Sequence, residues 1–350
     1  MNYFKIIILL LIIFVSCKKD EEKLVKNYYS CGVISTEVIS HTSTKAVVKV
    51  RFFVLDKSNN DGLINQNIIN NIIPPNSSYI GIIDSLKRIT TISKGNYSAA
   101  VLISDGLDET INMNDYFYIM EPAVRKFLHT SVPENEVLLA KVGDKINPLE
   151  IIGSGFTRNA DELDIPLAEI SKKGYFSTTD TLRLLEAIDS MIDYLNVKST
   201  YSNKNLFILY SRRKYFLQNQ NLDSIINKAK QSNITCHMLE FVPSYTWSNF
   251  SLKNFLVKLK TITNGIYVEG PPYYNNYEGG ELPMDMLQVS GKLNEMMKGN
   301  FECFEVIWTL TPTSSIFTSS KIYTTSFSVK LSTNYEQKEI DIPFHFYINP

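Results

Sequence analysis

The sequence predicts an α/β fold: a doubly wound, mostly parallel sheet flanked by N- and C-terminal β-rich, sandwich-like units. In the middle of the chain, short continuous apolar runs alternate with amphipathic stretches of helical period, as expected for strands buried on both faces. Before and after this part, β-branched and aromatic runs are separated by turn-forming residues. With 350 residues, of which 44% are hydrophobic and 20% charged, the chain has room for two or three folded domains.

The first 16 residues are predicted to be a signal peptide. Lys5 precedes an apolar run that ends at Ser16, and secretory signals combine a basic start with an apolar stretch of ~7–15 residues. The run is shorter than the ~20 residues of a spanning helix, although an uncut N-terminal membrane anchor is an alternative. Residues 14–17 resemble a lipobox, the cleavage site of bacterial lipoproteins, so we expect Cys17 to carry fatty acyl chains such as palmitate and to hold the chain on a membrane.

Residues 17–31 are expected to be a lipidated tether. The charged segment from Lys18 to Lys23 cannot bury enough apolar surface to order itself. It also resembles the short acidic export tag that sends some Gram-negative lipoproteins to the outer face of the outer membrane. We therefore expect a lipid-anchored protein of the bacterial outer membrane, with either leaflet left open.

Residues 32–95 are predicted to form a β-sandwich-like domain. The run 45–55 is β-branched and aromatic, the segment 56–62 is dense in turn formers, and two short strands are expected at 80–86 and 88–93.

Residues 96–270 are predicted to form the α/β domain. Amphipathic spacing and capping residues indicate helices, and apolar runs of four to eight residues indicate buried strands. The expected strands are 99–104, 136–142, 149–156, 205–210, 234–241 and 266–269, and the expected helices are 115–128, 181–195, 222–232 and 252–263.

Residues 271–299 are interpreted as a connector, a loop followed by a helix at 284–297. Residues 300–350 are predicted to form a C-terminal β unit, because three segments alternate apolar and polar residues. An alternative is that this unit pairs with the N-terminal β unit, so that the α/β domain is an insertion in one sandwich.

The sequence leaves open whether any of the cysteines form a disulfide. If Cys17 carries lipid, Cys31, Cys236 and Cys303 remain, and Cys236 lies in an apolar run typical of an inert core thiol. An oxidising compartment would permit a disulfide between Cys31 and Cys303, but spacing in the sequence cannot show that they meet.

The stretch 96–270 resembles the von Willebrand factor A (VWA) domain. An apolar strand ends in Asp105, a Ser/Thr cluster at 177–181 opens a helix, and the strand at 206–210 is followed by a helix-to-strand passage at 228–239. The resemblance implies a doubly wound sheet used for protein–protein interaction or adhesion. It also implies a divalent cation at the strand ends in many members, where oxygen ligands hold the ion and a partner carboxylate completes its coordination.

The cation ligands of the family are only partly present. The family pattern is Asp-x-Ser-x-Ser, but Asp105 is followed by Leu107 and Glu109, and Leu107 offers no ligand. Where the family has an Asp after the fourth strand, this chain has Arg212 and Arg213, whose fixed positive charges repel a cation. We therefore expect a degenerate site without metal, although Thr179 or Thr181 could still supply the loop hydroxyl.

The function predicted from these features is binding rather than catalysis, with no cofactor and no catalytic residues. Net charge is −1 and no basic block lies outside the tether, which excludes nucleic acid as an expected partner. We expect an unidentified protein of the cell envelope as partner. An alternative is a surface hydrolase in which Asp105 and Glu109 divide acid and base roles. The candidate binding face consists of Asp105, Asp108, Glu109, Thr179, Thr181, Arg212 and Arg213.

Overall fold

The computed structural model describes most of the chain from Tyr29 onward. The described residues are 29–56, 62–64, 69–73, 78–103, 114–143, 146–173, 181–211, 222–241, 250–269, 284–332 and 337–349. The predicted signal peptide, the lipidation site Cys17 and the tether up to residue 28 lie outside them. The first strand begins at Tyr29, so the last three residues assigned to the tether belong to a strand.

The middle of the chain forms the α/β unit predicted from the sequence. Its strands run in the order β8-β7-β6-β9-β10-β11. All neighbours are parallel except the edge pair β7–β8. The bounds are β6 (Tyr97–Ile103), β7 (Glu136–Val142), β8 (Leu149–Thr157), β9 (Asn203–Ser211), β10 (Ile234–Phe241) and β11 (Tyr267–Glu269).

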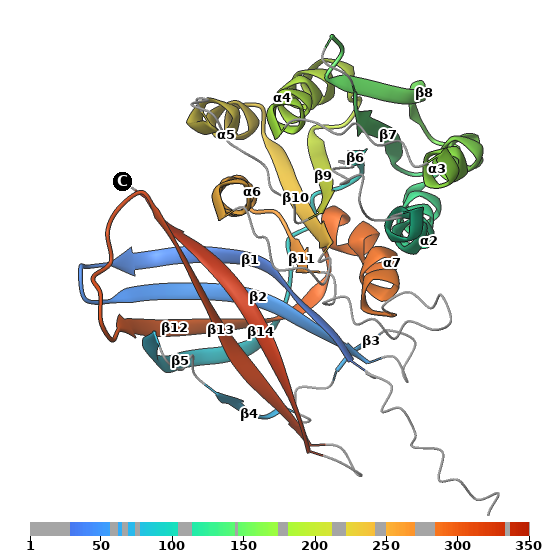
Figure 1. Ribbon diagram of the computed structural model, residues 1–350. Coiled ribbons are helices and arrows are strands. Elements are labelled where there is room, and N and C mark those ends of the chain that lie inside the picture. The colour runs from blue at the N-terminus through green and yellow to red at the C-terminus, as the bar shows by residue number, and fades with distance from the viewer. Residues whose placement is uncertain are drawn as a thin grey trace, which may run out of the picture.

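Helices cover both faces of this parallel sheet (Figure 1). One face carries α2 (Asn114–Ser131), α3 (Asp161–Lys173) and α7 (Met284–Lys298). The other carries α4 (Thr181–Lys198), α5 (Leu222–Gln231) and α6 (Phe250–Ile262). The sequence analysis did not predict α3, because this helix contains a proline and buries only a short stripe of apolar residues. It also placed α7 in a connector, whereas α7 packs beside α2 as part of the α/β unit.

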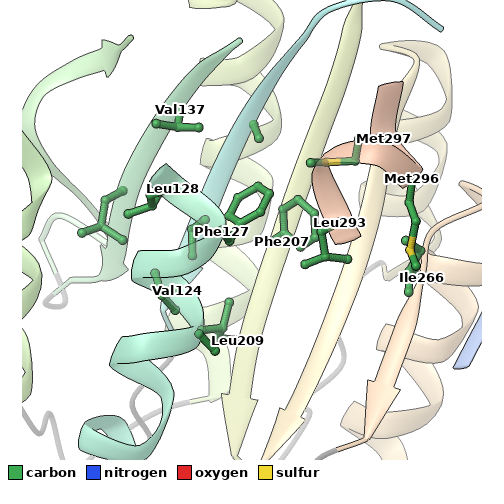
Figure 2. Packing of buried hydrophobic residues seen from close by; sticks show 14 of the residues in the cluster. Val124, Phe127, Leu128, Val137, Phe207, Leu209, Ile266, Leu293, Met296 and Met297 are labelled. Atoms are coloured by element: carbon green, nitrogen blue, oxygen red, sulfur yellow. The ribbon is translucent and has the colours of Figure 1, made fainter. Parts of the chain in front are cut away.

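The face covered by α2 and α7 has an aromatic centre. The rings of Phe127 on α2 and Phe207 on β9 lie 4.8 Å apart between centroids. Leu293 and Met297 of α7 complete the cluster (Figure 2). The opposite face is filled by aliphatic side chains of α4, which follow the predicted helical stripe: Leu184, Leu185, Ile188, Met191, Ile192 and Leu195.

The N- and C-terminal β segments form one sandwich instead of two flanking units. In its first sheet the order is β5-β12-β2-β1, so a C-terminal strand lies between two N-terminal strands. The second sheet has the order β14-β13-β4 and crosses the first (Figure 1). The α/β unit is therefore an insertion in this sandwich, the alternative left open by the sequence. The bounds are β1 (Tyr29–His41), β2 (Ala46–Asp56), β3 (Gly62–Leu63), β4 (Ile69–Ile73), β5 (Tyr79–Thr90), β12 (Glu302–Pro312), β13 (Lys321–Ser332) and β14 (Gln337–Ile348).

The sandwich core is rich in aromatic rings from both sheets. Trp308 of β12 is fully buried, and its ring centroid lies 5.6 Å from that of Phe327 on β13. Phe52 of β2 also meets Phe327, edge to face at 5.0 Å. Because aromatic pairs contribute beyond the area they bury, these contacts hold the two sheets together.

One strand of the sandwich differs from the prediction. The two short strands expected at 80–86 and 88–93 are a single strand, β5, which pairs with β12 along its whole length. A shift of register next to Trp308 lets β5 bulge and continue. The predicted break at Lys87 is not the bulge, because Lys87 pairs regularly with Glu305.

The sandwich and the α/β unit share one sheet, because Val33 of β1 pairs with Tyr267 of β11. Further contacts close this junction: the ammonium of Lys258 on α6 lies 5.4 Å from the ring centroid of Tyr347 on β14. Gly265 links α6 to β11, and a Cβ there would lie 1.7 Å from the carbonyl oxygen of Cys236. A side chain at position 265 would therefore push α6 away from the sheet.

None of the three cysteines of the described region is in a disulfide bond. Cys31 on β1 packs against the sandwich core, whereas Cys303 on β12 belongs to the cluster beneath α7. They face opposite sides of the sheet and do not form the disulfide left open by the sequence. Cys236 is fully buried, as predicted, and burial raises the pKa of its thiol to about 12.

Among the described helices, none combines the length and the apolar character needed to cross a bilayer.

Candidate functional site

The ends of four parallel strands define one edge of the α/β unit. β6 ends at Ile103, β9 at Ser211, β10 at Phe241 and β11 at Glu269. The strands are in register here, since Ile103 pairs with Leu209 and Phe241 with Ser211. We call this the carboxyl edge, and the edge where β6, β7, β9 and β10 begin the amino edge.

The order of the strands reverses between β6 and β9. From β6 the chain builds outward through β7 to β8, and from β9 it builds in the other direction through β10 to β11. Accordingly α2 leaves the end of β6 toward one face, and α5 leaves the end of β9 toward the other. In open α/β sheets such a reversal opens a crevice beyond the strand ends, and ligands bind there.

The predicted binding residues follow the strands that flank this reversal. Thr181 is the first residue of α4, although its side chain is outside the described part. The other six members of the predicted face also lie outside the described residues: Asp105, Asp108, Glu109, Thr179, Arg212 and Arg213. The structure thus gives the strands from which these residues follow, and their mutual contacts stay a prediction.

From their chemistry, we expect the residues that follow these strand ends to fit a divalent cation poorly. Asp105 follows β6 by two residues, and Arg212 directly follows the last residue of its neighbour β9. A hard cation needs several oxygen ligands, but Leu107 supplies none and the arginines bring positive charge to the adjacent strand end. We therefore expect the function of this edge to involve no metal ion.

The amino edge is held rigid by a buried carboxylate. Glu136, the first residue of β7, is 4% exposed. It accepts hydrogen bonds from the hydroxyl of Ser98 on β6 at 2.5 Å and from the backbone and hydroxyl of Thr200 at 2.7 and 2.8 Å. The carboxylate therefore ties together β6, β7 and the turn that leads into β9.

A second polar network fastens α7 to the amino edge. The hydroxyl oxygen of Tyr97 lies 2.7 Å from the hydroxyl oxygen of Ser131 on α2 and 3.1 Å from the side-chain oxygen of Asn294 on α7. Burial raises the pKa of Tyr97 well above its usual value. The amide of Asn203 donates to the carbonyl of Met297 at 3.0 Å. These contacts fix α7 and the start of β9 at the amino edge.

His237, on β10, has a structural role. Its ring stacks on Phe207 at 4.4 Å between centroids, its Nε2 lies 3.0 Å from the Asn205 side-chain oxygen, and its Nδ1 accepts a bond from the backbone of Ile266. Burial lowers its pKa to about 3, helped by the charges of Lys94 and Lys260. The ring is therefore neutral at physiological pH.

A cluster of ionisable groups that the sequence did not indicate joins α2 to α3. Ligand atoms of His129, Asp161 and Asp164 lie within 4.8 Å of one another, the one such group in the described part of the chain. The guanidinium of Arg125 pairs with the same carboxylate oxygen of Asp164 that faces His129. A positive charge already occupies the place where a cation would bind, so the cluster docks the acidic first turn of α3 onto α2.

Comparison with known proteins gave results only at the level of structure. No protein-family model matches the chain, and no curated protein matches its sequence. The ArnB paralog VWA2 from Sulfolobus acidocaldarius is 11% identical, with 92% of this chain and 76% of that chain covered and a TM-score of 0.37. A von Willebrand factor type A protein from Catenulispora acidiphila is 6% identical, with 92% and 75% covered and a TM-score of 0.44.

A third similar structure is the manganese-loaded TRAP protein of Plasmodium vivax, 11% identical over 78% of this chain and 100% of that chain, with a TM-score of 0.39. The VWA resemblance seen in the sequence is thus also found among solved structures. Similarity at these scores carries no argument of its own, and the fold assignment rests on the strand order of this chain.

Proposed function

We propose that this chain is a lipid-anchored protein of the bacterial outer membrane whose VWA-like unit binds a protein partner at its carboxyl edge, without metal and without catalysis. The observation that carries the proposal is the reversal of strand order between β6 and β9, beyond which ligands of such sheets bind. The predicted binding residues follow β6 and β9 and precede or begin α4.

The charges of this face favour a protein partner. Three acidic residues follow β6, namely Asp105, Asp108 and Glu109, while Arg212 and Arg213 follow β9. A surface that presents both signs side by side selects partners by complementary charge and excludes surfaces of a single sign. We expect calorimetric titration with Mg²⁺ or Mn²⁺ to show no stoichiometric binding in the ~mM range of weak sites.

The test is recovery of a partner from outer-membrane extracts with the full chain as bait. The triple substitution Asp105→Ala, Glu109→Ala and Arg212→Ala should abolish recovery of the partner. A matched control changes two exposed acids and one exposed base near the amino edge, namely Glu134→Ala, Glu295→Ala and Lys198→Ala, and should leave recovery unchanged. Equal recovery with both triple variants would remove the carboxyl edge from consideration.

The anchor is tested separately. In cells supplied with labelled palmitate, the full chain should incorporate label and fractionate with the outer membrane. Cys17→Ala should abolish the label and release the protein from the membrane, because a lipid chain anchors through its buried methylenes at ~0.8 kcal/mol each. Membrane retention of the Cys17→Ala chain would contradict the lipoprotein assignment and favour an uncut apolar anchor.

A further inference from the structure

The strand β5 lies at the edge of the first sheet of the sandwich (Figure 1). It pairs with β12 on one side from Tyr79 to Thr90, and among the described residues no strand pairs with its other side. Its twelve residues make an edge about 40 Å long. An edge strand presents a row of backbone N–H and C=O groups that another strand can pair with. The edge of β5 is therefore a place where a second chain can extend the sheet.

The usual devices that block a sheet edge are weak along β5. Charged side chains and proline commonly prevent such pairing, but β5 contains no proline and its charged side chains lean back onto β12. Asp84 accepts a hydrogen bond from the hydroxyl of Thr309 at 2.7 Å. The ammonium of Lys87 lies 3.1 Å from a carboxylate oxygen of Glu305, and Arg88 also pairs with a glutamate of β12. The side chain of Lys87 is still 58% exposed, so it can meet a second carboxylate.

The two faces of β5 differ in what they contact. Ile83 and Leu86 pack toward the sandwich core. The side chains that alternate with them lie on the opposite face, which we call the outer face: Ile80, Ile82, Asp84, Ser85, Lys87 and Ile89. Ile80 and Ile82 are each 60% exposed. The outer face thus presents apolar residues at both ends of the strand and an acid and a base near its middle.

We propose that two copies of this chain pair through β5, antiparallel about a two-fold axis, with Asp84 of each copy opposite Lys87 of the other. Ile82 then lies opposite Ile89, because Ile82 precedes Asp84 by two residues and Ile89 follows Lys87 by two. All four side chains belong to the outer face, so each pair meets on one side of the joined sheet. This inference goes beyond the function proposed above and involves neither the carboxyl edge nor the anchor.

Charge selects both a second copy as the occupant and this register. Two-fold symmetry makes the contact of Asp84 with Lys87 occur twice. Opposite charges on neighbouring strands stabilise a sheet, whereas like charges directly opposite weaken it. If the second copy slid by two residues, Lys87 would lie opposite Ile82 and both charge pairs would be lost. In a parallel arrangement, each charge would lie beside its own kind. β5 therefore carries both halves of the match.

The geometry can be tested with one cysteine on each copy. The proposed axis passes between Ser85 and Leu86, so the two Ser85 Cα atoms lie about 6 Å apart, within reach of a disulfide. The full chain with Cys31→Ser and Ser85→Cys should form a disulfide-linked dimer when intact cells are oxidised, read on a non-reducing gel. The matched control is Ile307→Cys on β12, opposite Ser85, whose Cα atoms would lie about 14 Å apart and should not link.

Three results of this experiment would overturn the proposal. One is the absence of a linked dimer with Ser85→Cys. The second is equal linkage with Ile307→Cys, which would indicate random collision. The third is linkage of Ser85→Cys to a different protein alone, which would assign the edge to another partner.

The register can be tested by exchanging the two charges in the full chain purified in detergent. Asp84→Lys and Lys87→Asp each set like charges opposite one another at two places, so each should raise the dissociation constant of the dimer about fivefold or more. The double variant restores opposite charges and should return to within about twofold of the unaltered chain. Sedimentation velocity over a concentration series measures both. The control exchanges two exposed charges of α4 and α5, Glu186→Lys with Lys230→Asp, and should change nothing.

Recovery in the double variant decides the outcome. If either substitution acted by destabilising the fold, the two effects would add and not cancel, and circular dichroism would show the loss. A double variant that dissociates as readily as the single variants would overturn the proposed pairing. So would an unaltered chain that stays monomeric at every concentration.

Discussion

The α/β unit and the β-sandwich differ in how far apart along the chain their neighbouring strands lie. In the α/β unit, β9 and β10 are joined through a single helix, α5, and their parallel pairing runs from Ile234 to Phe241. In the sandwich, β12 pairs with β2 and β5 across the whole inserted unit, so that Trp308 meets Val48 and Ile83. Local alternation of strand and helix therefore specifies the α/β unit, whereas the sandwich forms only when the two ends of the chain meet.

The two regions also differ in what they bury. The sandwich core consists mainly of apolar and aromatic side chains around Trp308 and Phe327, although Glu305 and His345 are also buried there. The α/β unit buries His237 and Lys260, and burial lowers the pKa of His237 to about 3 and that of Lys260 to about 8. We therefore expect the largest effect in the sandwich from loss of volume and the largest effect in the α/β unit from pH.

The largest effect is expected from truncation of the sandwich core. Trp308→Ala should lower the free energy of unfolding by about 3–5 kcal/mol, since it leaves a cavity between the sheets. Phe207→Ala is the matched truncation in the α/β unit. Because β1 and β11 share one sheet, each variant should shift a single transition in urea, followed by both circular dichroism and tryptophan fluorescence. Two separate transitions in Trp308→Ala would show that the regions unfold independently.

An exposed apolar residue on the same sheet provides the control. Ile82 on β5 is 60% exposed, and Ile82→Ala should change stability by less than about 0.5 kcal/mol. A comparable loss in this variant would mean that this face of β5 is covered in solution.

The second effect is a loss of stability in acid that originates in the α/β unit. His237 has a folded pKa of about 3 against an ordinary value of 6.5. Between these values the unfolded chain binds the proton and the folded chain does not, so the free energy of unfolding falls as pH falls from 6.5 toward 3. The loss should reach a few kcal/mol, and denaturant titrations at several pH values would measure it.

Replacement of the imidazole tests that assignment. His237→Gln keeps polar atoms near Asn205 and Ile266 but cannot take up a proton in this range. Its stability should change less between pH 6.5 and pH 4 than that of the unaltered chain. The same acid slope in His237→Gln would assign the titration to other groups.

The smallest effect concerns Lys260 on α6, which is 1% exposed. Burial lowers its pKa from 10.5 to about 8, and among the described residues none hydrogen-bonds to its ammonium group. The amine is still charged at pH 7, so Lys260→Met should raise stability there by about 1 kcal/mol, because it removes a buried charge. Between pH 8 and 10.5 the unaltered chain gains stability as pH rises, and the advantage of Lys260→Met should shrink. A loss of stability at pH 7 would indicate that the charge has a partner in the folded protein.

Prediction from the sequence was accurate where local signals were strong. The stripe from Leu184 to Leu195 gave α4, and the apolar run ending at Ile103 gave β6. It missed α3, where Pro166 and a narrow stripe weaken the helical pattern. It divided β5 in two at Lys87, although the pairing with β12 is continuous there and Lys87 lies opposite Glu305. The His129, Asp161 and Asp164 cluster was not indicated, because residues far apart in the sequence meet only when α2 and α3 pack together.

The residues of the candidate site were predicted from the sequence, whereas the carboxyl edge of the sheet was found only in the structure. The identities of Asp105, Leu107 and Arg212 determine which ligands this edge excludes, since charge and ligand atoms are properties of the side chains themselves. The strands that they follow, β6 and β9, pair in parallel, which no local pattern shows.

By itself, the sequence determined the alternation of strands and helices and the chemistry of the loops that follow them, because both depend on neighbouring residues and on side-chain type. Only the tertiary structure decided that β12 lies between β2 and β5, that Cys31 and Cys303 face opposite sides of a sheet, and that β1 starts at the carboxyl edge. Such long-range pairings depend on the total apolar surface that two distant segments bury together, a quantity that neither segment carries alone.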